Sequence, residues 1–177
     1  MIESYNTNEL ENAIDYLEQT AVFYNNKENN HRFKWVCIGL HGALYGFAVC
    51  NIRGTDYNRV LVKGDKHFQD RNLLGIGTVL KLCKQEDMLT NVNGKVLVLN
   101  EYQDAAIVRL TDFRNYFSHF KPSGYGITIP LDEIVKPILE VIYFLAIESN
   151  NVLYHSRSQR ERIQQAFDSI KLEIPCE

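Results

Sequence analysis

This 177-residue chain contains few prolines and no excess of positive charge, and each of these features excludes a class of protein. Only four prolines accompany 45% hydrophobic residues, which excludes a disordered chain. A net charge of −3 and a pI near 6.0 exclude a protein that coats nucleic acid with a broad basic surface, although a compact cationic pocket would hardly change the total. A chain of this length is most simply one domain, so we predict a single domain over residues 1–177.

Paired cysteines and a long apolar run are also missing. The four cysteines, at positions 37, 50, 83 and 176, form no CxxC pair and no zinc-like spacing. The opening MIESYNTNEL has no targeting pattern, and the apolar run from Trp35 to Cys50 is shorter than a membrane span needs. We therefore expect a cytoplasmic protein with reduced, buried thiols, no membrane partner and no metal or other cofactor.

Helical periodicity is present along most of the chain. Asn8 and Glu11 have N-cap spacing, and apolar residues recur on one face to about Tyr24. The segment 33–52 is apolar almost all round, which predicts a helix enclosed by others. Its three glycines, at 39, 42 and 46, fall on one side and predict a closely packed neighbouring helix. Further helices are predicted at about 74–89, 100–120, 130–147 (kinked or restarted at Pro137) and 156–170.

Together these elements predict an all-α fold. We expect an antiparallel bundle of four to six helices, with one long connecting loop over residues 53–72 and at most short pieces of strand.

The segment RNYFSHF, residues 114–120, mixes an arginine, an amide and an imidazole with three aromatic rings. On a helical wheel the aromatics and Ala105 face the core. The opposite arc holds Arg114, Thr111, Asn115, Ser118 and His119, with Ile107 and Val108. Two β-branched apolar residues on this arc, and no Glu or Lys between 114 and 119, favour contact with another surface over a solvated face. The last helical turn favours cations, so this arc fits an anion site, with phosphate as the anion.

The hexapeptide from Arg114 to His119 resembles the signature of the HEPN family. In that family an Arg, often followed by a polar residue such as Asn, precedes a His by four to six intervening positions near the end of a helix. FKWVCIGLHGALYGF and FRNYFSHFKPSGYGITI are further similar to a bacterial HEPN-like group, and the all-α class fits. The resemblance implies a metal-independent endoribonuclease that acts on RNA at a homodimer interface. A toxin with an antitoxin partner, or a phage-defence effector, would be such a protein.

The resemblance also implies roles for individual residues. His119 would activate a 2′-hydroxyl or protonate the leaving 5′-oxygen. Arg114 would hold the scissile phosphate, and Asn115 would orient one of these groups. Ser118 would assist, and Lys121, which replaces a tyrosine found in some members, could contact RNA phosphate.

A two-fold axis would bring the two charged residues together. Arg114 and His119 lie about 140° apart on an ideal helix, so they flank the polar arc within one chain. In a homodimer, Arg114 of one chain would approach His119 of the other, with Ile107, Val108 and Thr111 in the interface.

Other interpretations fit the same residues. The chain could be a non-catalytic module that binds a nucleotide or a protein partner, or a structural dimer in which Ile107 and Val108 matter and Arg114 does not. Cys37 and His41, at i and i+4, could share a metal, but a buried thiol beside a satisfied core histidine is the simpler interpretation. The three arginines within 157–162 fit a solvated helix face or an extended RNA-binding surface.

Overall fold

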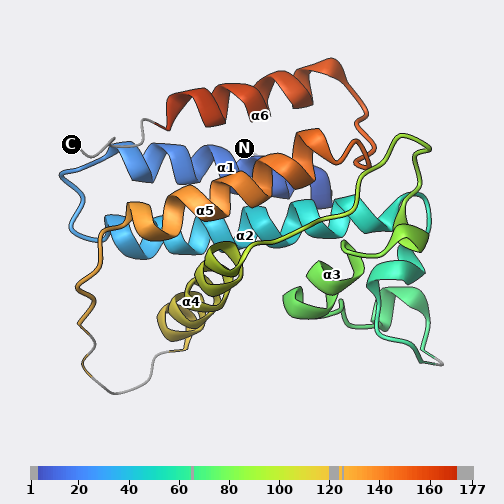
Figure 1. Cartoon of the computed structure of the whole chain (residues 1–177), viewed down its shortest axis with the longest axis horizontal. Coiled ribbons are helices and arrows are strands. Elements are labelled where there is room, and N and C mark those ends of the chain that lie inside the picture. The colour runs from blue at the N-terminus through green and yellow to red at the C-terminus, as the bar shows by residue number, and fades with distance from the viewer. Residues whose placement is uncertain (1–3, 65, 120–123, 125, 171–177) are drawn as a thin grey trace.

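The computed structural model describes residues 4–64, 66–119, 124 and 126–170, and within them the all-α class is confirmed (Figure 1). The α-helices of this part of the chain are α1 (Glu9–Asn25), α2 (Arg32–Arg53), α3 (Ile76–Leu82), α4 (Glu101–Ser118), α5 (Asp132–Tyr143) and α6 (Arg157–Ser169). Short 3-10 turns form η1 (Tyr57–Val60), η2 (Phe68–Asp70) and η3 (Glu86–Met88), and a π-helical turn forms η4 (Phe144–Glu148). Among the described residues the only β pairing is one antiparallel bridge, between Leu61 and Leu73.

The helices surround α2. It contacts α1, α3, α4 and α5, while α6 packs on the other side of α1. In Figure 1, α1, α2, α5 and α6 extend in similar directions, α4 crosses them steeply, and α3 lies with the long connection near the end of α2. The buried apolar residues form one cluster to which all of these helices contribute.

The composition of α2 explains its central place. Its buried residues run from Val36 to Ile52, and 72% of its most apolar window is buried. By length and composition it is the one helix in the described residues that could cross a membrane, and its burial is that of a core helix in a soluble protein.

The glycines of α2 let α1 approach closely. A Cβ atom on Gly42 would lie 2.5 Å from Cγ of Tyr16, and one on Gly46 would lie 2.6 Å from Cβ of Ala13. No side chain larger than hydrogen fits these positions without movement of α1. The predicted close neighbour of the glycine side is therefore confirmed.

Local sequence signals place two helix starts. The Asn8 side chain accepts a hydrogen bond from the Glu11 backbone N–H at 2.9 Å and begins α1. At α4, Asn100 accepts from the Gln103 N–H at 2.8 Å while the Gln103 side chain accepts from the Asn100 N–H at 3.2 Å. This reciprocal pair is a capping box, as the spacing predicts.

Two helices differ from their predicted extent. The helix expected at 74–89 ends at Leu82, because the carbonyl of Cys83 accepts from the Leu97 N–H at 2.8 Å and the chain turns away. By contrast, α5 continues through Pro137 without a restart. Proline leaves the carbonyl of Glu133 without its helical donor, and the Tyr102 hydroxyl of α4 donates to that oxygen at 3.4 Å.

Candidate functional site

The orientation of α4 determines which of its side chains are available. Ile107 is only 9% exposed and Leu110 is fully buried, whereas Ala105 is exposed. The predicted placements of Ile107 on the outer face and Ala105 on the core face are therefore wrong. They fail because α4 packs against both α2 and α5, which rotates its buried arc toward Ile107. Ile107 is therefore buried within the chain and not on the outer face, where Val108, which is 61% exposed, is an apolar residue.

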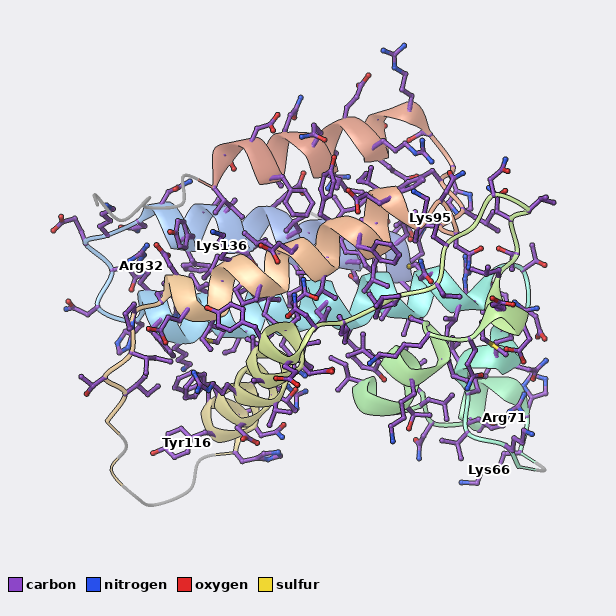
Figure 2. All side chains as sticks on the ribbon, viewed as in Figure 1. Arg32, Lys66, Arg71, Lys95, Tyr116 and Lys136 are labelled. Atoms are coloured by element: carbon purple, nitrogen blue, oxygen red, sulfur yellow. The ribbon has the colours of Figure 1, made fainter. Side chains whose placement is uncertain are left out.

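Aromatic packing fixes the end of α4 that carries the motif. The ring of Phe33 in α2 meets Phe113 edge-on at 5.2 Å and Phe117 at 6.4 Å between ring centroids. Figure 2 shows Tyr116 near the same end of α4, with its side chain directed away from the other helices. Phe113 and Phe117 thus anchor this end of α4 to α2 through aromatic packing.

Arg114 does not project outward with the rest of the predicted polar arc. It is half-buried and lines a partly open cavity of about 360 Å³ between α1, α2 and α4. Ser118, one turn further along α4, lines the same cavity, opposite walls that include Tyr16 of α1 and His41 and Tyr45 of α2. The structure therefore brings a cation, a hydroxyl and an imidazole to one partly open cavity.

Asn115 and Thr111 make contacts within α4. Nη1 of Arg114 donates to Oδ1 of the exposed Asn115 at 3.1 Å, so the amide holds the guanidinium from one side. The half-buried Thr111 donates its hydroxyl to the Ile107 carbonyl at 2.8 Å. Asn115 is thus positioned to orient Arg114, and the Thr111 hydroxyl is occupied by its own helix.

His119 lies apart from this cavity. It is the exposed C-cap residue of α4, where its backbone N–H donates to the Asn115 carbonyl at 3.1 Å. Lys121 lies outside the described residues. Within one chain, the structure thus gathers Arg114, Asn115 and Ser118 and leaves His119 on the free end of the helix.

His41 is the group that sequence reasoning undervalued. It is 7% exposed, as a core histidine should be, but no described residue forms a hydrogen bond with its ring. The predicted core position is confirmed, and the ring nitrogens, which are not among the buried atoms without a partner, are open to the cavity. Burial, and then the positive charge of Arg114, lower the pKa of His41 to about 4, so the imidazole is neutral at pH 7.

Tyr45 orients the imidazole. The two rings meet at 66° with centroids 6.4 Å apart, and the Tyr45 hydroxyl donates to the carbonyl of Leu74. Burial raises the pKa of Tyr45, so this hydroxyl stays protonated. The signal for the pair is present in the sequence, because His41 and Tyr45 are the polar-tipped rings at i and i+4 of an otherwise apolar helix.

The His, Cys, Asp and Glu side chains that could ligate a metal do not form a metal site in the described residues. No group of three or more His, Cys, Asp or Glu side chains gathers within the described ranges. Cys37, Cys50 and Cys83 are free and buried, which confirms the prediction for these three, and burial raises the pKa of each to about 12. Cys176 lies outside the described residues. Such thiols are poor nucleophiles and poor ligands at neutral pH.

Comparisons with protein-family models, with curated proteins and with solved structures find no significant match to this chain.

Proposed function

We propose that the chain is a HEPN-like, metal-independent endoribonuclease whose reactive groups lie at the C-terminal end of α4. The observation that best supports this is the placement of Arg114. Its guanidinium is half-buried at a cavity and bonded to Asn115, five positions before an exposed histidine on the same helix. A guanidinium in a partly enclosed site binds phosphate more strongly than one in bulk water.

The chemistry assigned to these residues needs one proton carrier and one charge stabiliser. Arg114 would bind a non-bridging oxygen of the scissile phosphate and stabilise the charge that develops as the 2′-oxygen attacks. His119 would take the 2′-proton or supply a proton to the departing 5′-oxygen. Ser118 lines the same cavity as Arg114 and could donate to the phosphate, while Asn115 keeps the guanidinium in place.

The exposed position of His119 favours assembly from two chains. Arg114 lines the cavity while the exposed His119 caps the end of α4 outside the cavity lining, an arrangement that suits a site completed by a second chain. In a homodimer built on the outer face of α4, His119 of the second chain would complete the site of the first. A biological role as a toxin with an antitoxin, or in phage defence, rests on the family resemblance alone.

RNA cleavage in excess EDTA tests this proposal. The purified protein should cut single-stranded or loop RNA and leave a 2′,3′-cyclic phosphate. Arg114→Ala and His119→Ala should each slow cleavage by about 100-fold or more. His31→Ala, at the exposed start of α2, is the matched control and should cleave at the normal rate. Cleavage that requires a divalent metal, or that survives both substitutions, contradicts the proposal.

A non-catalytic nucleotide-binding module is the alternative that a specific observation favours. The cavity beside Arg114 has the concave, mostly apolar character of a ligand site, whether or not strand cleavage follows. Nucleotide binding without cleavage by the wild-type protein would support this alternative.

A further inference from the structure

The cavity between α1, α2 and α4 holds an unexplained polar group. His41 is 7% exposed and lines the cavity; no described residue forms a hydrogen bond with its ring, and neither ring nitrogen is among the buried atoms without a partner, so both nitrogens are open to the cavity. Buried polar groups in folded proteins are almost always hydrogen-bonded. The donor and the acceptor of a neutral imidazole are therefore free to bind water or a ligand inside the cavity.

The side chains that line the cavity indicate the shape and polarity of a ligand that would fit it. Aromatic and aliphatic side chains form most of the wall, including Tyr16, Tyr45, Ile38 and Leu73. His41 supplies neutral hydrogen bonding on the buried side, and the half-buried Arg114 supplies a positive charge. A complementary ligand has a flat ring with hydrogen-bonding edges at one end and an anion at the other. A volume of about 360 Å³ is in the range of small-molecule sites.

We propose that this cavity is a nucleobase pocket. The nucleotide whose phosphate meets Arg114 places its base against the rings of Tyr16 and Tyr45, and the ring nitrogens of His41 bind an edge of that base. Neutral His41 suits this task because it offers one donor and one acceptor, whereas a charged imidazole would offer two donors. Aromatic side chains are common platforms for unpaired bases. The inference rests on the proposed function, in that it takes the phosphate on Arg114 to belong to RNA.

Two features hold the pocket open in this form. The ring of Tyr16 lies directly over Gly42, where any Cβ atom would collide with it, so α1 and α2 present the ring at a fixed position. The bond from the Tyr45 hydroxyl to the Leu74 carbonyl fixes the ring that contacts His41. The pocket is therefore largely formed before a ligand arrives.

Calorimetric titration with the four ribonucleoside 3′-monophosphates and with inorganic phosphate tests the pocket. At least one nucleotide should bind wild-type protein about ten-fold or more tightly than phosphate does. His41→Phe keeps a ring of similar size but removes the donor and the acceptor. It should lower the affinity for that nucleotide by about ten-fold or more and leave phosphate affinity within about two-fold. Arg114→Gln should weaken both, and His31→Gln, an exposed histidine of α2, should change neither.

A second measurement needs no substitution in the pocket. In protein with isotope-labelled histidine, the ring signals of His41 should shift on addition of the nucleotide and stay in place on addition of phosphate. Three results would each contradict the nucleobase pocket. They are nucleotides that bind no better than phosphate, His41 signals that do not change on addition of nucleotide, and a folded His41→Phe protein that binds nucleotide as wild-type protein does.

Failure of the pocket can be separated from failure of the ribonuclease. If wild-type protein binds a nucleotide through His41 but cuts no RNA, the pocket stands and the ribonuclease assignment falls. If RNA is cut in EDTA with full dependence on Arg114 and His119, but His41→Phe keeps the wild-type preference for bases, the ribonuclease stands and the pocket falls.

Discussion

His41 is a buried base whose protonation the fold opposes. Burial is the larger cause of its lowered pKa and the charge of Arg114 is the second. Around it, Arg114 comes from α4, Tyr45 from α2, and Tyr16 and Glu9 of α1 line the same cavity. Glu9 forms an ion pair with Arg53, so its carboxylate is already engaged. Protonation of His41 therefore places a second cation beside Arg114.

Acid should destabilise the protein through this residue. An ordinary histidine has a pKa near 6.5 and folded His41 has one of about 4, so between these values the unfolded chain binds more protons. The free energy of unfolding therefore falls as the pH drops from 6.5 toward 4, by about 2.5 kcal/mol at pH 4.5. Urea denaturation at pH 7 and pH 4.5 gives the free energy of unfolding at each pH. Its fall between the two pH values should be smaller in His41→Phe than in wild-type protein, by about that amount. Equal losses in the two proteins would show that His41 does not titrate in this way.

Two contacts between elements can be tested by matched pairs of substitutions, and the first is the contact of α1 with α2. Gly46→Ala would set a methyl group 2.6 Å from Cβ and 3.1 Å from Cα of Ala13, so α1 must move. We expect a loss of about 1–3 kcal/mol in the free energy of unfolding. Gly77→Ala is the control, because nothing lies within 4 Å of a Cβ there and alanine favours α3. Urea denaturation should therefore separate the two variants, and a Gly46→Ala protein as stable as Gly77→Ala would contradict the close packing.

The second contact joins α6 to α1 through Arg162. Its guanidinium donates to both carboxylate oxygens of Glu18, at 2.8 and 2.6 Å, and to Glu11 at 2.7 Å. Glu11 also accepts from the Gln159 side chain at 2.7 Å, and these hydrogen bonds lower the pKa of Glu11. Through these hydrogen bonds Arg162 joins α6 to α1, so its guanidinium is not free to extend an RNA-binding surface.

Removal of Arg162 should loosen α6. Arg162→Ala should lower the free energy of unfolding by about 1–2 kcal/mol, since it removes a bidentate pair and a third bond. Arg157→Ala removes only an i,i+4 pair with Glu161 whose arginine is 92% exposed, and should change it by less than about 0.5 kcal/mol. Denaturation curves for the two variants should differ accordingly, and equal effects would argue against the network.

At the scale of elements, the sequence predicts what is local and misses what depends on packing. The caps at Asn8 and Asn100 and the enclosed character of α2 are local signals, and the structure contains all of them. The rotation of α4 is set by its contacts with α2 and α5, so a wheel drawn on its aromatics placed Ile107 on the wrong side. The cavity at His41 arises from three helices at once, and only the i,i+4 spacing with Tyr45 hints at it.

For the whole molecule, the proposed two-chain site requires a homodimer, and we expect the interface on the outer face of α4. Val108 is an exposed apolar residue of that face, so Val108→Glu should weaken the dimer by about ten-fold or more, equivalent to about 1.4 kcal/mol. Val92→Glu, at a fully exposed turn position, is the control and should leave association unchanged. Sedimentation over a range of concentrations measures both. A wild-type protein that stays monomeric at micromolar concentration would remove the shared site.

The central claim is that Arg114 of one chain acts with His119 of another. In the direct test, Arg114→Ala and His119→Ala proteins are mixed, unfolded and refolded together. RNA cleavage by the refolded mixture is then measured in excess EDTA. Random assembly makes half of the dimers mixed, and each mixed dimer has one intact site of two, so about a quarter of wild-type activity should return. If the refolded mixture is no more active than either variant alone, while wild-type protein treated in the same way recovers its activity, the shared Arg–His site is contradicted.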